Sequence, residues 1–418
     1  MTSNKQNSPL VTPKIRQARI ATFAGFMLLG ALFYTWSVGV TAFRNHLGLS
    51  GSLGDMDFGM LALGIAVGAA FGAFLVGYAV DYFSPRAVLR ILLIGYPVSF
   101  ICLAVVPDYW FAMVFACILG FLRGATDTAL NAHGVEVERY YERPIMSSFH
   151  AFFSLGGFLF GFIASYLAGF STESAIIPFT TAGVSLAIFG LITSKYMLGK
   201  NDLLPVPALS APSAASSSQM DWRVLFLMIV FGFILIAGMI GESSVSDWGQ
   251  EFMHRERGMD ITHAGMAISL YTGAGFIARL TGDWLAARIG RASMLFLSCV
   301  VSIVGMLCAT LSKEPSMSVL GCLLLGAGLA CIAPLMLGAA GQKDPANAGR
   351  NVGIVNGIGF FGMLGGPAIY SLIITAYGIE ALFYLPLVLM AIVTLIAPLS
   401  VRAKPAQEHS KNMSYAAR

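Results

Sequence analysis

Three polar side chains recur at one-turn spacing within an otherwise apolar stretch of the chain. Arg123, Asp127 and Asn131 are four residues apart, which places them on one face of a helix. A charge near the middle of the bilayer costs at least about 2.5–3.5 kcal/mol, so such residues usually face a cavity or pair with each other. The stripe therefore indicates a polar path through a helix bundle. An acid at a helix end that reaches water is the alternative for Asp127.

Aromatic and acidic residues lie at matching depths of two other apolar stretches. At the offset of an internal repeat, Glu242 corresponds to Ser37, which follows Trp36. Sugar sites combine an aromatic ring, which covers the apolar side of the sugar, with charged groups that bond its hydroxyls. We therefore expect Tyr34, Trp36, Glu242 and Trp248 to line a substrate path. The alternative is a helix end at the membrane surface with belt aromatics.

Two acids are candidates for proton coupling, because this role needs a group whose proton affinity changes with exposure or with substrate. They are Asp127 and Glu242. His150 is a further candidate for the substrate path, although a lone histidine can equally be a packing residue. Arg279 is expected to pair locally at the inner end of its helix.

The elements that position these residues follow from composition. Hydrophobic residues make up 57% of the 418 residues and charged residues 11%, against roughly 45–50% and 25% in soluble domains. A spanning helix needs about 20 mostly apolar residues. Twelve such runs occur, at roughly 20–43, 57–80, 87–106, 109–132, 145–170, 175–194, 223–243, 261–282, 292–312, 317–341, 352–376 and 379–401. The fold predicted is an all-α membrane protein.

The two halves of the chain are copies of one unit. Between 68–87 and 273–292, eight of twenty residues are identical. The predicted organisation is a six-helix half over 1–199, a linker rich in Pro, Ser and Ala over 200–221, and a second six-helix half over 222–418. A substrate site between the halves is typical of such repeats.

Basic residues predict the orientation. With the N-terminus inside, 19 Lys and Arg fall on the cytoplasmic side and four (Arg44, Arg255, Arg257 and Lys313) on the outer side. We therefore expect a multi-pass protein of the plasma membrane, a bacterial inner membrane, with both termini cytoplasmic and an uncleaved first span. This asymmetry accounts for the net charge of +4, so no nucleic-acid partner is expected.

The loop after the second span resembles a signature of the major facilitator superfamily, Gly-x-x-x-Asp-x-x-Gly-x-Arg. It reads Gly77-Tyr-Ala-Val-Asp81-Tyr-Phe-Ser-Pro-Arg86, with Ser84 in place of the second glycine, and the second half has a copy from Gly282 to Arg291. The resemblance implies twelve helices in two halves and a cytoplasmic latch made by acids and bases. The gate candidates are Gly77, Asp81, Arg86, Glu138, Arg139, Arg288 and Arg291.

A narrower resemblance is to the fucose-permease-like branch of that superfamily. It rests on the stretch from Asp127 to Arg139, on Pro144 to Gly157, on Glu242-Ser-Ser-Val-Ser-Asp247-Trp248 and on Phe33-Tyr-Thr-Trp36. The branch includes sugar–proton symporters. The fifth span lacks the Gly-Pro pair of drug antiporters, which argues against efflux.

Together these features predict a secondary active transporter that moves a small polar solute, a sugar or related metabolite, by proton-coupled alternating access. No phosphate-binding loop is present, and the six cysteines lie within apolar runs without Cys-x-x-Cys spacing, so no ATP site, metal or cofactor is expected. Partners should be the solute, protons and the lipid bilayer, with the chain a monomer. The alternatives are an efflux antiporter, a polytopic membrane enzyme and a non-transporting sensor; an enzyme would need a dense His/Asp cluster, which the sequence lacks.

Overall fold

The computed structural model describes residues 11–141, 145–171, 173–202, 222–343 and 348–401. The first half contains α1 (Pro13–His46), α2 (Gly51–Phe83), α3 (Pro85–Ala104), α4 (Tyr109–Tyr141), α5 (Met146–Ala168) and α6 (Ile176–Ser194), followed by the short 3-10 helix η1 (Lys200–Asp202). The second half contains α7 (Trp222–Arg255), α8 (Ile261–Ile289), α9 (Arg291–Leu311), α10 (Pro315–Leu329), α11 (Ile332–Lys343), α12 (Ala348–Tyr377), the 3-10 helix η4 (Ile379–Phe383) and α13 (Tyr384–Val401). Each of the twelve predicted spans is helical in this described part. Most of the predicted linker, 203–221, lies outside it.

The tenth predicted span, 317–341, is not one continuous helix. It is divided into α10 and α11 at Ala330 and Cys331. Pro334 explains the break: it has no N–H to donate to the carbonyl of Ala330, and its ring clashes with that carbonyl. The proline was visible in the sequence, so this interruption was predictable.

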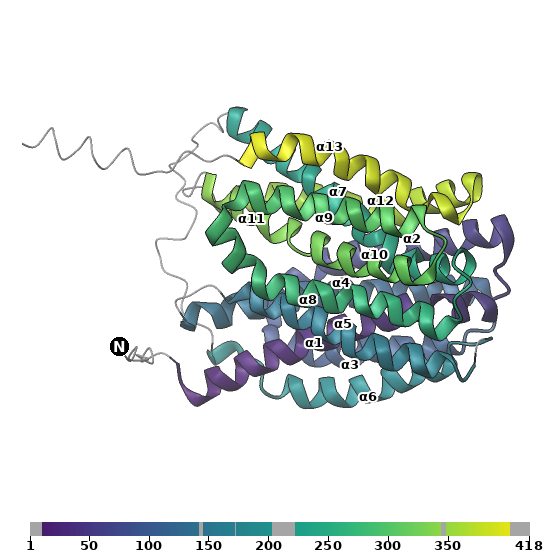
Figure 1. Cartoon of the computed structure of the whole chain (residues 1–418). Helices are drawn as coiled ribbons and strands as arrows, with labels where there is room; N and C mark the ends of the chain where they lie inside the picture. The colour runs from purple at the N-terminus through teal and green to yellow at the C-terminus, as the bar shows by residue number, and fades with distance from the viewer. Residues whose placement is uncertain (1–10, 142–144, 172, 203–221, 344–347, 402–418) are drawn as a thin grey trace, which may run out of the picture.

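The helices lie side by side along one direction (Figure 1), as expected for a bundle that crosses a bilayer. Ten helical segments of the described residues are long and apolar enough to span a membrane. The two halves meet where α8 packs on α5 and α12 packs on α2.

The two halves pack in the same way. In the first half α1 packs on α5, α2 on α4 and α3 on α6, and in the second α7 packs on α12, α8 on α10 and α9 on α13. At the centre, α1 packs along α7 in a register four residues beyond the offset of the sequence repeat, so Ser37 meets Ser246 and not Glu242. The Ser37 hydroxyl donates to the carbonyl of Ser246, and the Thr41 N–H donates to Oε1 of Gln250, with each pair 209 residues apart. An approximate two-fold axis therefore passes between α1 and α7.

We call the end of the bundle where α1 begins at Pro13 the near end, and the end where α1 finishes at His46 the far end. The near end contains the turns between α2 and α3 and between α8 and α9. Ser84 (φ 106°, ψ 152°) and Gly290 (φ 85°, ψ 151°) have almost the same conformation in these turns. This region of backbone space favours glycine strongly, so the serine is strained. The glycine of the signature is thus a requirement of the turn.

Glycines bring α2 and α4 into direct backbone contact. A Cβ added at Gly120 or Gly124 would lie 2.0 Å from the carbonyl oxygen of Ile65 or Ala69, respectively. Small residues allow such close approach of helices in a membrane, where dispersion forces hold the bundle together. This crossing fixes the height and rotation of Arg123, which lies between Gly120 and Gly124 on α4.

Candidate functional site: a cavity shared by the two halves

A small internal cavity of ≈ 20 Å³ lies between the halves. Helices of the first half (α1, α2 and α4) and of the second half (α7 and α12) form its wall. The lining residues are Trp36, Ala62, Ile65, Ala66, Ala69, Arg123, Asp247 and Pro367. The cavity therefore brings one guanidinium group from the first half and one carboxylate from the second half to the same space.

Arg123 is held on the wall of this cavity by contacts on several sides. Its guanidinium carbon lies 4.1 Å from the ring centroid of Phe33, in cation–π geometry. It is also within electrostatic range of Asp127 and Asp247. The cation thus interacts with an acid of its own helix and with an acid of the opposite half.

Asp127, Asn131 and His150 form one hydrogen-bonded chain between α4 and α5. The Asn131 amide donates to Oδ1 of Asp127 at 3.1 Å, and its Oδ1 lies 3.2 Å from Nε2 of His150. Asn131 also donates to the carbonyl of Asp127 at 2.9 Å. His150 packs on the ring of Phe26, with centroids 5.0 Å apart, and is nevertheless exposed. The structure thus brings these three predicted residues together in one chain of hydrogen bonds.

On the opposite wall, α7 contributes two half-buried acids. Asp247 accepts a hydrogen bond of 2.5 Å from the Ser243 hydroxyl, one turn earlier on the helix. Glu242 lies within electrostatic range of Tyr34 and Tyr271, whose ring centroids are 6.4 Å apart. Both acids face groups of other helices, so Glu242 lies in the interior of the bundle.

Arg279 bonds across the halves, contrary to the expectation of a local pair. Its Nη1 donates to the hydroxyl of Ser154 on α5. The reason is the close packing of α8 against α5: at Gly265, a Cβ would lie 2.4 Å from the Ser165 hydroxyl. The side chain therefore reaches the opposite half more readily than it reaches back along its own helix.

The predicted aromatic residues occupy different places. Trp36 lines the cavity. Tyr34 is buried close by, with its ring 6.1 Å from that of Phe153. Trp248 is fully buried toward the far end, where its ring is 4.9 Å from that of Phe58, and it is not among the residues that line the described cavity.

The near-end gate candidates contact neighbours in their own half. Glu138 accepts hydrogen bonds from the N–H groups of Ile145 and Met146 at 2.6 and 3.0 Å, and so caps the start of α5. The remaining described pairs are Arg139 with Glu136 at 2.9 Å and Arg288 over the ring of Trp284 at 4.0 Å. Arg291 begins α9. The surroundings of Gly77 and the side chain of Asp81 lie outside the described part of the structure.

Arg86 helps to fasten the segment after α6 to the near end. It donates to the carbonyl of Met197, and its Nη2 lies 3.6 Å from Oδ2 of Asp202. Burial raises the pKa of the Asp202 carboxyl, but hydrogen bonds from Lys14 and the N–H of Gly199 and the charges of Lys14 and Arg86 outweigh it, so the pKa is below its ordinary value. The carboxylate therefore stays ionised and ties α1, α3 and η1 together.

Sequence reasoning missed Ser243 and Asp247 as site residues, as well as Tyr271. The signal for the first two was present, since they are four residues apart within the motif that starts at Glu242. In the part of the chain that the structure describes, no group of three or more metal-binding side chains occurs. The arrangement supplies charges, hydroxyls and aromatic faces from both halves, which suits the binding and passage of a polar solute.

Known proteins share this architecture and sequence. The family model of the Major Facilitator Superfamily matches residues 230–414. An uncharacterised MFS-type transporter of Yersinia pestis is 29% identical over 374 residues, which are 88% of this chain and 91% of that protein. The uncharacterised transporter y4wD of Sinorhizobium fredii (strain NBRC 101917 / NGR234) is 27% identical over 375 residues, 90% of this chain and 96% of that protein. The second half of the chain thus matches the Major Facilitator Superfamily model, and nearly the whole chain is similar to transporters of this type.

Solved structures of this superfamily agree with the fold. A crystal structure of a D-xylose–proton symporter matches with a TM-score of 0.74 at 13% identity, covering 92% of this chain and 97% of that one. A nucleoside transporter, NupG, matches with a TM-score of 0.70 at 15% identity, covering 92% and 100%. A D-xylose transporter of Levilactobacillus brevis is 26% identical over 149 residues, 35% of this chain and 33% of that protein. These similarities and the apolar helices of the described residues indicate a multi-pass membrane transporter.

Proposed function

We propose that this transporter moves a small polar solute, with a sugar or related metabolite favoured, by proton-coupled alternating access. The observation that carries the proposal is the meeting of Arg123 and Asp247, from opposite halves, in one cavity. A solute that bonds both groups bridges the halves, so its binding changes their relative stability in the two access states.

The chemistry of the wall favours a solute rich in hydroxyl groups. A solute hydroxyl can accept a hydrogen bond from the guanidinium, whose N–H groups point in fixed directions. The same hydroxyl, or its neighbour, can donate a hydrogen bond to the carboxylate. Trp36 supplies an aromatic face on the same wall. The likeness to the D-xylose transporter and the D-xylose–proton symporter supports the same class of solute, as does the fucose-permease-like motif from Glu242.

The charge balance of the interior supports proton coupling. Among the described residues of this part of the bundle, there are three acids, Asp127, Glu242 and Asp247, and two guanidinium groups, Arg123 and Arg279. Of these five, Arg123 and Asp247 line the cavity. Unbalanced charge in a low-dielectric interior is costly, so taking up one proton stabilises the empty site. When the halves move, one of the three acids releases this proton on the other side of the membrane. Solute flux is thereby coupled to the proton gradient.

The size of the cavity supports movement between access states. Sites for small molecules usually enclose about 300–1,000 Å³, whereas this cavity of ≈ 20 Å³ has room for about one water molecule. A sugar can therefore bind only when the halves separate. In the proposed orientation the near end is cytoplasmic, the far end faces outward, the membrane is a bacterial inner membrane, and one chain suffices for transport.

Solute binding can be tested by thermal unfolding of the purified protein with D-xylose, L-fucose, uridine and gluconate. A solute that binds only the folded protein raises its stability, by about 2.7 kcal/mol at one hundred times its Kd. We expect at least one neutral hydroxylated solute to raise the midpoint for wild type and for Asp57→Asn, an exposed control acid, but not for Asp247→Asn. Equal shifts in the two variants, or no shift with any of these solutes, would overturn the proposal.

A further inference from the structure

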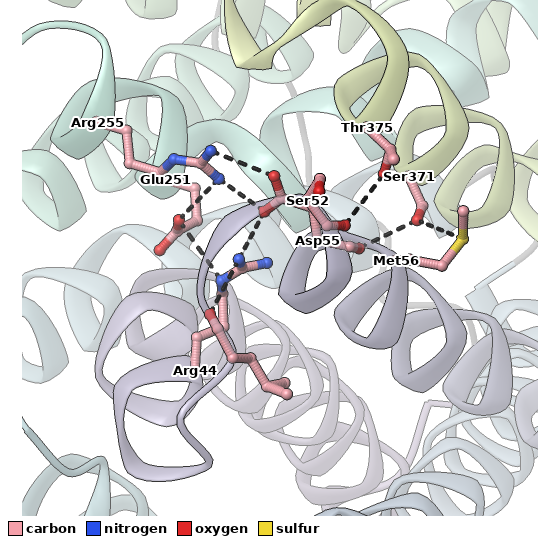
Figure 2. A network of polar contacts seen from close by, with 9 residues as sticks. Arg44, Ser52, Asp55, Met56, Glu251, Arg255, Ser371 and Thr375 are labelled. Atoms are coloured by element: carbon pink, nitrogen blue, oxygen red, sulfur yellow. Dashed lines mark hydrogen bonds and ion pairs between the residues drawn. The ribbon is translucent and has the colours of Figure 1, made fainter.

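Four charged residues at the far end form a network that joins the two halves (Figure 2). Asp55 of α2 lies between two arginines, 2.6 Å from Nη2 of Arg44 on α1 and 2.7 Å from Nη1 of Arg255 on α7. Glu251 of α7 lies 3.5 Å from Nε of Arg44 and 3.7 Å from Nη1 of Arg255. We call these four residues the far-end quartet.

Three of the four side chains are buried, and the quartet is electrically neutral. The side chains of Arg44, Asp55 and Glu251 are 3%, 3% and 4% exposed, whereas Arg255 is 33% exposed. Removing one partner of a buried ion pair is strongly destabilising, because an uncompensated charge remains. Any movement that opens the far end must therefore provide each buried charge with a partner.

The pairing pattern meets this requirement. Two contacts cross between the halves, Arg255 with Asp55 and Arg44 with Glu251, and these must break when the far end opens. The other two contacts lie within one half, Arg44 with Asp55 and Arg255 with Glu251 one turn apart on α7. After separation each half thus retains one cation and one anion that already lie close together.

Neighbouring contacts show that this end is closed in the structure. The Ser371 hydroxyl of α12 donates to the carbonyl of Asp55 at 3.0 Å, and the Gln250 amide donates to the carbonyl of Val38. Arg44 also lies over the rings of Phe58 and Trp248, at 5.0 and 5.5 Å. The quartet is therefore part of a continuous seal between the halves.

We propose that the far-end quartet is the outer gate of the transporter and that it opens by exchange of ion-pair partners. In the closed state Asp55 is shared by both arginines. In the open state Asp55 keeps Arg44, and Arg255, the most exposed member, turns to Glu251. The proposal rests on the alternating access proposed above and assigns the gate residues that the sequence left out.

Two double charge reversals distinguish partner exchange from a static brace. Arg44→Glu with Asp55→Arg keeps the pair within the first half but places like charges across the halves, so it should favour the open far end. Asp55→Arg with Arg255→Glu keeps a cross-half pair but places like charges within each half, so it should favour the closed far end. Both variants contain the same arginine at position 55 and the same total charge.

The readout is labelling of Ala62→Cys on the cavity wall by a membrane-impermeant maleimide added outside intact cells, with the six native cysteines replaced by serine. We expect the first double variant to label about ten-fold faster than the parent, within the usual range of coupling between sites, and the second no faster than the parent. Equal labelling of the two would overturn the proposal. Labelling needs no solute, so a failure of the gate proposal can be told apart from a failure of the transport proposal.

A single neutralisation covers the case in which the double variants do not reach the membrane. Arg255→Gln removes the 2.7 Å ion pair with Asp55, which joins the two halves, and should raise the labelling rate. Arg257→Gln is the matched control, because Arg257 is at the same helix end but bonds Glu256, Ser318 and the carbonyl of Ala309 within the second half. If Arg255→Gln labels like the parent and like this control, the quartet is not a gate.

Discussion

Gly124→Ala should destabilise the protein through the contact between α2 and α4. The added Cβ would lie 2.0 Å from the carbonyl oxygen of Ala69. Restoring an ordinary contact of about 3.4 Å needs the helices to move apart by about 1.4 Å, and overpacking of this kind costs about 1–3 kcal/mol. Because Arg123 is the adjacent residue, the same displacement moves its guanidinium relative to Asp247, so solute binding should weaken as well.

Gly95→Ala is the matched control on α3. Its added Cβ would lie 3.5 Å from the nearest atom, in Leu122, which is ordinary contact. Both substitutions gain about 1 kcal/mol of helix propensity, so the difference between them isolates the steric effect. In thermal unfolding in detergent, we expect Gly124→Ala to melt about 2–6 °C below Gly95→Ala. Equal midpoints would refute the direct backbone contact between α2 and α4.

Three further substitutions test separate parts of the account. Asp127→Asn should reduce folded yield and transport more than the double change with Arg123→Gln, because the single change leaves a buried charge without compensation; strict additivity would show that the two do not interact. Ser84→Gly should raise the unfolding midpoint by relieving backbone strain of about 1–3 kcal/mol, and an unchanged midpoint would argue against strain there. Glu242→Gln should reduce uphill accumulation more than exchange of internal for external solute; equal loss of both would assign Glu242 to binding, and no loss to a structural role.

Local features of the sequence predicted most of the helices. Length and hydropathy locate a span because each segment meets lipid separately. The ends were less predictable: α1 begins at Pro13 and α4 continues to Tyr141, beyond the apolar runs that start at 20 and end at 132. Helices can extend into water or against protein with polar residues, so hydropathy marks the membrane rather than the helix end.

The site was only partly predictable, because the rotation of a helix depends on its neighbours. The spacing of Arg123, Asp127 and Asn131 indicated one face of α4, and the structure connects that face to His150. The sequence did not indicate which residue of α7 lines the cavity, because the rotation of α7 depends on its packing against α1 and α12. The motif from Glu242 to Trp248 contains Asp247, but the structure was needed to show that this residue lines the cavity.

The far-end quartet shows the same limit more strongly. Asp55 and Arg255 are 200 residues apart in sequence. In the sequence, Arg44 and Arg255 could be recognised only as basic residues of outer loops. They reach the acids that they share only when the two halves of the bundle pack together. Paired charges of this kind have no local sequence signal.

The most direct test of the central claim is accumulation of the identified solute in right-side-out membrane vesicles under an inward acid gradient. The comparison should include Asp247→Asn, Arg123→Gln and the exposed control Asp57→Asn at equal membrane levels. We predict accumulation by wild type and the control that a protonophore abolishes, and none by either cavity variant. Full accumulation by Asp247→Asn, or accumulation that persists with the protonophore, would contradict proton-coupled transport through the shared cavity.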